Sequence, residues 1–320
     1  MADDTSIGDQ LLDLCAGANE CLVLVAPFIK HPVMERVIQA TAPQVEIRCY
    51  TRWRPEEIAS GVSDITIWHL LSQRQATSLW LVARLHAKYY RADDVCLVGS
   101  ANLTNRALGW CPWPNLELVS FAPSKHFEGF EEKVRSESVA VDQAIYEATL
   151  QAAEAINPYS MPFTGAPSES SESHANEVSM SPSGSYSTWL PSLRHPEDLF
   201  LAYVGDVNTL SRTTSSAAKR DLLTLNLPDG LAEPAFRAYV GALLLQQPMV
   251  KLVDEFVAEP RRFGAVRELL ATRTRTEAGG PQDGPTHAWQ SLMRWLLYFL
   301  PRRYTLTTPH HSEIFARRST

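Results

Sequence analysis

Cysteine is scarce in this chain of 320 residues. The five cysteines are odd in number and form no Cys-x-x-Cys pair, so the sequence predicts neither a disulfide framework nor a structural zinc site. Cys49 and Cys96 lie in apolar, strand-like runs, which favours reduced and buried thiols.

Long hydrophobic runs are also missing. The longest apolar stretches, around residues 21–29 and 292–300, are too short to cross a bilayer. The acidic N-terminus is followed by no apolar segment of the kind found in signal peptides. We therefore expect a cytoplasmic protein that does not bind membranes.

An excess of positive charge is absent too, since the formal net charge is −7. Bulk nucleic-acid binders are usually basic, so the composition does not point to that class. A nuclease remains compatible with this charge because it needs only a local positive groove. With 45% hydrophobic residues, the chain can form a sizeable core, and its length predicts two domains.

Strands alternate with helices in the first half of the chain, which predicts an α/β layer fold with a mixed sheet flanked by helices. Asp64 is interpreted as the cap of the helix that follows it. The predicted strands cover residues 21–29, 45–50, 79–82, 84–90, 95–98 and 116–121. The predicted helices cover residues 7–18, 32–41, a segment from 55, 65–73 and 127–156.

The chain is expected to divide into a catalytic domain at residues 1–157, a flexible linker at 158–187 and a mainly α domain at 188–320. Proline, serine, glycine and glutamate dominate the linker, a composition that cannot bury enough apolar surface to fold. The helical domain would recognise nucleic acid or bind a protein partner. Its predicted helices cover residues 196–204, 216–224, 234–246, 249–258, 261–272 and 287–299.

Residues 85–102 carry the candidate chemistry. His86 and Lys88 lie two residues apart, so on a strand both side chains would point to the same face. A second apolar run ends in the turn Gly99-Ser100-Ala101-Asn102, which presents a hydroxyl, an amide and backbone N–H groups. Together with the ammonium these groups can hold a phosphate, and the histidine beside them is placed to attack it.

The order His86-x-Lys88, Asp93 and Gly99-Ser100-x-Asn102 resembles the HKD motif of the phospholipase D superfamily. The gap between Asp93 and Gly99 is one residue shorter than in the commonest form of that motif. The similarity covers about residues 1–150 and points to the bacterial single-motif branch, which includes nucleases and restriction-type enzymes. Further matching segments are Ala26-Pro27-Phe28-Ile29, Thr51-Arg52, Gly61-x-Ser63-Asp64 and Asn115-x-Glu117.

This resemblance implies a phospholipase D-like domain and a phosphodiesterase reaction that uses no metal and no cofactor. One histidine attacks phosphorus to give a phosphohistidine, and a second protonates the leaving oxygen and then activates water. Carried over, His86 is the nucleophile or acid/base. Lys88 and Asn102 would stabilise charge on the phosphoryl oxygens, with Ser100 assisting. Glu117 would orient the histidine. Asp93, also a candidate catalytic residue, more often supports local structure in the family.

The chain contains one His-x-Lys, whereas the family's sites use two. We therefore expect a homodimer through the catalytic domain, with His86 of each subunit at the axis. The predicted protein is a nuclease, acting on DNA rather than RNA, with a role in restriction or anti-phage defence. The alternatives are a phospholipid hydrolase and a non-catalytic subunit that keeps the fold to bind a partner.

Substrate contacts are expected from Arg52, Arg91, Gly99 and Arg106, with Arg52 favoured because it follows a strand end where α/β sites are built. Solvated arginines are an equally good interpretation. Trp110 and Trp113 either stack on a base or, more simply, pack within the fold or contact a second subunit.

Residues 249–270 offer two interpretations as well. A helix-turn-helix would place Arg261, Arg262 and Arg267 against DNA. An ordinary helical hairpin is the interpretation that we favour.

Overall fold

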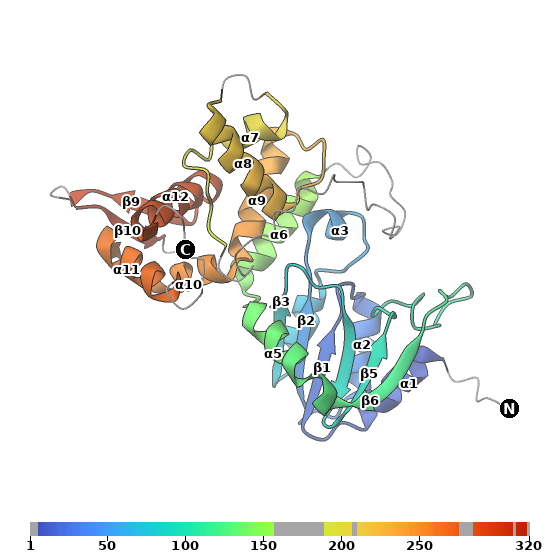
Figure 1. Ribbon diagram of the computed structural model, residues 1–320. Coiled ribbons are helices and arrows are strands. Elements are labelled where there is room, and N and C mark those ends of the chain that lie inside the picture. Colours follow the sequence, from blue (N-terminus) through green and yellow to red (C-terminus); the bar gives the residue numbers. More distant parts are fainter. Residues whose placement is uncertain (1–5, 157–188, 207–209, 275–283, 310–311, 319–320) are drawn as a thin grey trace. The chain divides into compact units, whose positions relative to one another are not determined.

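The computed structural model describes residues 6–156, 189–206, 210–274, 284–309 and 312–318. The chain divides into two compact units, Met1–Ala153 and Glu154–Thr320, and each is described by itself (Figure 1). The predicted linker at 158–187 lies outside the described residues. Within the described ranges, no helix has both the length and the apolar character needed to cross a membrane.

The first unit is built on a seven-stranded mixed sheet in the order β6-β5-β4-β1-β2-β3-β7. Strands β1, β2 and β3 are parallel to one another, and each of the other strands is antiparallel to its neighbours. The strands are β1 (Cys21–Val25), β2 (Glu46–Thr51), β3 (Thr77–Leu81), β4 (Lys88–Ala92), β5 (Val95–Gly99), β6 (Val119–Pro123) and β7 (Val139–Ala140).

Helices flank this sheet, as the sequence predicted. The first of them begins at a capping box, in which the Ser6 side chain accepts from the backbone N–H of Asp9 and the Asp9 side chain accepts from that of Ser6. The helices are α1 (Ile7–Ala16), α2 (His31–Ala40), α3 (Pro55–Ala59), α4 (Ile67–Ser72), the 3₁₀ turn η1 (Ser124–Phe127), α5 (Glu128–Glu137) and α6 (Gln143–Ala155).

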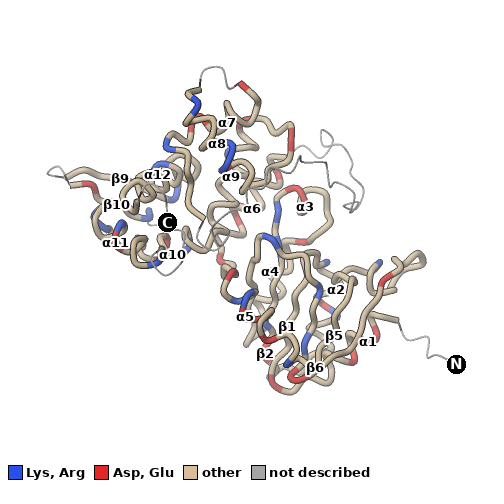
Figure 2. The backbone as a smooth tube through the Cα atoms, viewed as in Figure 1, with Lys and Arg blue, Asp and Glu red and all other residues tan. Residues whose placement is uncertain are grey.

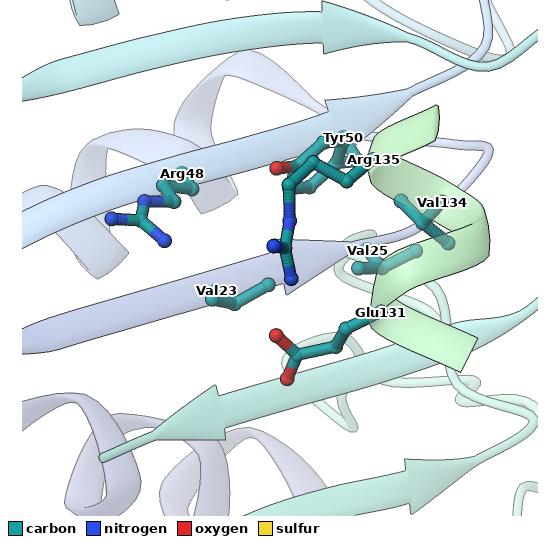
Figure 3. Close-up of a pocket in the computed structure, with 7 residues that line it drawn as sticks. All are labelled: Val23, Val25, Arg48, Tyr50, Glu131, Val134 and Arg135. Carbon is teal, nitrogen blue, oxygen red and sulfur yellow. The ribbon is translucent and has the colours of Figure 1, made fainter. Parts of the chain in front are cut away.

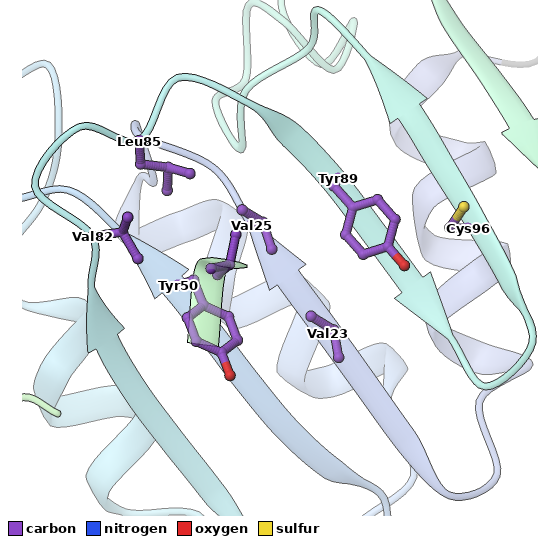
Figure 4. Packing of buried hydrophobic residues seen from close by; sticks show 8 residues of the cluster. Val23, Val25, Tyr50, Val82, Leu85, Tyr89 and Cys96 are labelled. Atoms are coloured by element: carbon purple, nitrogen blue, oxygen red, sulfur yellow. The ribbon is translucent and has the colours of Figure 1, made fainter. Parts of the chain in front are cut away.

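The core of this unit lies on both faces of β1, which explains its continuous apolar run. Val23 and Val25 belong to a buried cluster with Tyr50, Tyr89 and Val134, the last of these from α5 (Figure 4). The neighbouring side chains of β1 alternate to the opposite face and are also fully buried.

The predicted α/β layer fold is confirmed, but several element boundaries were wrong. The strand expected at 84–90 begins only at Lys88, and the one expected at 116–121 begins at Val119. The helix expected over 127–156 is interrupted by β7, which adds an edge strand beside β3. The first two segments are short, so periodicity does not separate strand from coil in them.

The assignment of Asp64 was also wrong. The helix that follows it, α4, has Thr66 as its N-cap. The Asp64 carboxylate instead accepts from the backbone N–H of His31 at 2.8 Å and pairs with the Lys30 ammonium. Because Lys30 cannot cap α2 through its own side chain, Asp64 satisfies the N-terminus of that helix from a distant part of the sequence.

The second unit is mainly helical, as predicted, but it also contains a three-stranded sheet in the order β8-β10-β9. Its helices are α7 (Asp198–Tyr203), α8 (Arg212–Leu225), α9 (Glu233–Leu245), α10 (Pro248–Phe256), α11 (Phe263–Thr274) and α12 (Gly284–Phe299). Its strands are β8 (Arg261–Arg262), β9 (Tyr304–Thr307) and β10 (Ile314–Arg317). Strand β8 separates α10 from α11, so neither interpretation of residues 249–270 as a simple helix pair was right.

Candidate active site

Three neighbouring strand ends bring candidate catalytic residues to one end of the sheet. Strand β4 begins at Lys88, which is in register with Gly99 at the end of β5, and Gly99 is in register with Val119 at the start of β6. Ser100 follows β5 directly, and Glu117 lies two residues before β6. The antiparallel pairing therefore gathers an ammonium, a hydroxyl and a carboxylate from distant parts of the sequence.

His86 lies in the irregular segment before β4, and its side chain is exposed. The strand that the sequence predicted to carry both His86 and Lys88 begins only at Lys88, so the argument that a strand places both side chains on one face does not apply. The segment before His86 is held by a residue that is distant in the sequence. The Arg52 guanidinium donates to the carbonyl of Leu85 at 3.0 Å. This hydrogen bond fixes the backbone next to the candidate nucleophile.

Arg52 is itself held by Glu57, through hydrogen bonds from Nε and Nη2 to the two carboxylate oxygens. Burial raises the pKa of Glu57, and Arg52 opposes that rise. The sequence favoured Arg52 for substrate contact, whereas in the structure its guanidinium is engaged with protein groups. Glu57 was missed, because its role depends on the contact between Arg52 and Leu85 that no local pattern encodes.

Gly99 is required by the close approach of β5 and β6. A Cβ atom at this position would lie 2.0 Å from the carbonyl oxygen of Leu118. The backbone N–H of Ser100 donates to that same carbonyl at 3.0 Å, and the N–H of Leu118 donates to Ser100 Oγ at 3.1 Å. The Ser100 N–H is therefore part of the fold, not one of the phosphate-binding groups that the sequence suggested.

Glu117 is half-buried and held by two neighbours. Ser100 Oγ donates to one carboxylate oxygen, and Asn115 Nδ2 donates to the other at 3.1 Å. These bonds give the carboxylate a fixed orientation beside the ends of β4 and β5. The role proposed for Glu117 in orienting His86 stays a prediction.

Asn102 lies in a segment that is pinned on both sides. The Tyr90 hydroxyl donates to the carbonyl of Ala101 at 2.6 Å, and the N–H of Leu103 donates to the carbonyl of Phe28 at 3.2 Å. Asn102 Oδ1 is buried and has no hydrogen-bond partner among the described residues. An unsatisfied buried acceptor costs about 1–3 kcal/mol, so this oxygen is expected to accept a hydrogen bond from a water or a ligand donor.

Asp93 lies at the opposite end of β4, about 16 Å from Lys88 at 3.3 Å per residue. Its carboxylate accepts backbone N–H groups of Asn19, Glu20 and Cys21 at 2.8–3.0 Å, at the entry to β1. Desolvation opposes ionisation, yet these bonds hold the pKa of Asp93 below its usual value. The residue lies in a turn with φ of 48°. The geometry assigns Asp93 a structural task, as the family resemblance suggested.

Arg91 also lies away from this cluster. Its guanidinium pairs with Glu131 of α5, with Nε 2.6 Å from the carboxylate, and donates to the Asp93 carbonyl at 2.8 Å. Glu131 lines a cavity of about 10 Å³ between α5 and the sheet (Figure 3). This space is no larger than one water molecule, so it does not suggest a binding site.

Two other candidates lie in the loop between β5 and β6. Arg106 is exposed, and its carbonyl accepts the N–H of Asn115 at 2.9 Å, which closes the segment between these two residues. Trp110 packs closely against Gly8 of α1, and the guanidinium of Arg36 lies 4.6 Å from its ring centroid. Trp110 therefore has a packing role, whereas Trp113 is 81% exposed.

In the described part of the chain, no group of three or more His, Cys, Asp or Glu side chains is arranged to hold a metal ion. No protein-family model matches the chain, and no curated protein matches its sequence.

Comparison with solved structures finds partial similarity. NucT from Helicobacter pylori is 15% identical at a TM-score of 0.33, over 42% of this chain and 89% of that one. Nuc from Salmonella typhimurium, a phospholipase D family member, is 15% identical at a TM-score of 0.34, over 44% of this chain and 95% of that one. TrmBL2, an archaeal chromatin protein with a novel mode of DNA binding, is 13% identical at a TM-score of 0.31, over 41% of this chain and 48% of that one.

The first unit is an α/β domain with a mixed sheet flanked by helices. The structural neighbours include a member of the phospholipase D family. Because the overlaps are partial and the identities low, the proposed function rests on the residues of this site.

Proposed function

We propose that the first unit is a metal-independent phosphodiesterase that cleaves nucleic acid. The observation that supports this most is the meeting of Lys88, Ser100 and Glu117 at one end of β4, β5 and β6, directly beside the exposed His86. The Lys88 ammonium at this point can hold a phosphate, and an accessible imidazole next to it can attack the phosphorus.

In the proposed reaction, an imidazole nitrogen of His86 attacks phosphorus. A nitrogen–phosphorus bond forms while the bond to the leaving oxygen breaks, and that oxygen takes a proton from His86 of the partner subunit. The partner's His86 then removes a proton from water, whose oxygen attacks phosphorus and releases the first histidine. Lys88 and Asn102 would stabilise the negative charge that develops on the phosphoryl oxygens.

A homodimer is part of the proposal because one chain supplies one His-x-Lys, and in-line displacement needs an acid opposite the nucleophile. The surface beside the site supports such an interface. Trp113, Leu116, Leu118 and Phe121 are 81%, 103%, 78% and 50% exposed. Phe121 lies on the edge strand β6 and the other three lie in the loop before it, and exposed large apolar side chains of this kind fit an interaction surface.

The proposed activity is tested by incubating the protein with single-stranded DNA, duplex DNA, RNA and phosphatidylcholine vesicles in EDTA. We expect cleavage of nucleic acid that persists in EDTA and is lost in His86→Ala. His126→Ala is the matched control, because this exposed histidine lies in η1 at the other end of β6. Turnover of lipid alone would support a phospholipid hydrolase, and no turnover together with a stable protein complex would support a binding subunit.

The dimer is tested separately by sedimentation and by activity. Leu116→Glu should convert the dimer to a monomer and abolish cleavage, because a charge then lies in the apolar interface. Leu223→Glu is the control, since Leu223 is 71% exposed on α8 of the other unit. A fully active monomer would contradict the composite site.

A further inference from the structure

The last six elements of the second unit follow the order helix, strand, helix, helix, strand, strand. These are α10, β8, α11, α12, β9 and β10, and the first strand pairs with the last: Arg262 is in register with Ile314, and Phe315 with Leu306 of β9. The resulting sheet order, β8-β10-β9, is that of a winged helix-turn-helix. In that arrangement α11 and α12 form the helix pair, and the β9–β10 hairpin forms the wing.

An aromatic core fixes α12 against the sheet and α11. The ring centroid of Trp289 lies 5.2 Å from that of Phe315 on β10 and 6.3 Å from that of Phe263 at the start of α11. The N-terminal half of α12 therefore lies beside the first turn of α11 and close to Arg262, which precedes that turn. The two helices thus lie side by side, as the helix pair of a helix-turn-helix does.

The N-terminal half of α12 keeps one polar stripe accessible. Thr286 and His287 are exposed, and Gln290 and Arg294 are half-exposed at helical spacing. The Oε1 atom of Gln290 is buried, so the exposed part of this residue is the rest of its side chain. Toward its C-terminal end α12 packs on α9, where the carbonyl of Phe299 lies 3.1 Å from a Cβ built on Gly241.

Positive charge gathers on this module, although the whole chain is acidic. Figure 2 shows Lys and Arg positions on α11 and around α12. The exposed arginines of α11, of the three strands and of the residue after β10 are Arg262, Arg267, Arg273, Arg317 and Arg318. Arg261, which the sequence also offered as a candidate, donates to the carbonyl of Phe256 at 3.1 Å and stacks on its ring. It therefore supports the turn after α10.

We propose that this module binds duplex DNA, with the start of α12 in the major groove and Arg262 and Arg267 against the phosphates. The surface fits this ligand because a polar stripe on a helix can read base edges while flanking arginines neutralise the backbone. The inference deepens the proposed nuclease function, since it names the polymer that the chain would hold. It does not depend on cleavage, because binding is measured without it.

The test measures binding of the full-length chain to a labelled 30-base-pair duplex by fluorescence anisotropy, over a series of salt concentrations. His86→Ala is present throughout, so that the DNA is not cut. Arg262→Ala with Arg267→Ala should weaken binding roughly 10-fold or more and reduce the slope of log affinity against log salt by about two, one for each phosphate that is no longer neutralised. His287→Ala should weaken binding and leave the slope unchanged, because this side chain would touch bases in the groove and no phosphate.

The matched control is Lys219→Ala with Arg220→Ala, which removes the same charge from exposed positions on α8. Equal weakening in the control and the test variant would overturn the proposal, since it would show general electrostatic attraction. No duplex binding at low salt, with a protein partner bound instead, would overturn it as well. Cleavage is assayed separately on the protein with His86 intact. If the test variant binds DNA more weakly as expected but the protein with His86 intact shows no EDTA-resistant cleavage, the nuclease proposal fails and the DNA-binding proposal stands.

Discussion

Asp254→Asn should lower the free energy of unfolding of the second unit by about 3–5 kcal/mol, the usual cost of leaving a buried charge without its partner. The Asp254 carboxylate is 2% exposed and accepts from Arg303 Nε and Nη2 at 2.8 and 2.6 Å. The Tyr304 hydroxyl donates to it at 2.7 Å, and Arg317 Nη1 lies 3.3 Å away. These bonds join α10 to β9 and β10, and so hold the winged module together.

The magnitude follows from which bonds are broken. Asparagine keeps one acceptor, so the bidentate pair with Arg303 is broken, and hydrogen bonds to charged groups are each worth about 1.5–3 kcal/mol. Burial opposes ionisation of Asp254, but Arg303, Tyr304 and Arg317 outweigh it and hold its pKa below the usual value. A carboxyl group whose pKa is lowered by folding stabilises the folded state at pH values above its unfolded pKa of about 4. The advantage of wild type should therefore shrink as the pH falls through the lower, folded pKa.

The assay is urea unfolding of the full chain, followed by tryptophan fluorescence, because Trp289 and Trp295 are fully buried in this unit. Glu255→Gln is the control on the same helix, and it should change stability by no more than about 0.5 kcal/mol. Asp254→Leu combined with Arg303→Met should be less destabilised than the two single variants added together, since no charge is left unpaired. A decrease below about 1 kcal/mol for Asp254→Asn, or strict additivity, would refute the reasoning.

Three further predictions concern the site and a buried acid. Gly99→Ala should lower both the melting temperature and cleavage, because its Cβ would lie 2.0 Å from the Leu118 carbonyl; an unchanged melting curve would contradict this. Glu57→Gln should lower kcat while changing KM little, since Arg52 then holds the segment before His86 less firmly. Equal changes in both constants would argue against a positioning role. Burial raises the pKa of Asp221 to about 7. The free energy of unfolding should therefore fall by up to about 4 kcal/mol as the pH rises from about 4 through 7, where the unfolded chain loses this proton first. Urea unfolding at pH 5 and pH 8 should show this decrease in wild type and not in Asp221→Asn.

The sequence predicted those parts of the fold whose pattern is local. The apolar run of β1 and the Gly99-Ser100 turn were correctly identified, because burial on both faces and a close backbone approach leave a signature in consecutive residues. The sequence pattern led us to predict a strand over 84–90, which includes the segment before His86. It is irregular in the structure, where Arg52, 33 residues away from Leu85, holds it in place.

Short strands in the second unit were missed for a related reason. Strand β8 has two residues, Arg261 and Arg262, and its polar sequence gives no alternation to detect. Its identity as a strand depends on pairing with β10, more than 50 residues later in the chain. The order of elements that indicates a winged helix could therefore be recognised only after the sheet was known.

The direction of each strand explains which motif residues form the site. In α/β sheets, sites lie at the carboxyl ends of parallel strands, and Arg52 lies just beyond that end of β2. Strand β4 runs antiparallel to β1, with Tyr89 in register with Val25, so the beginning of β4 lies at the same end of the sheet. Lys88 therefore lies at the same end of the sheet as Arg52, whereas Asp93, five residues later, emerges at the far end, where it anchors the entry to β1. The His-x-Lys…Asp pattern thus combines two roles. Lys88 lies at the candidate site, where it can take part in chemistry, and Asp93 holds the entry to β1 at the opposite end of the sheet.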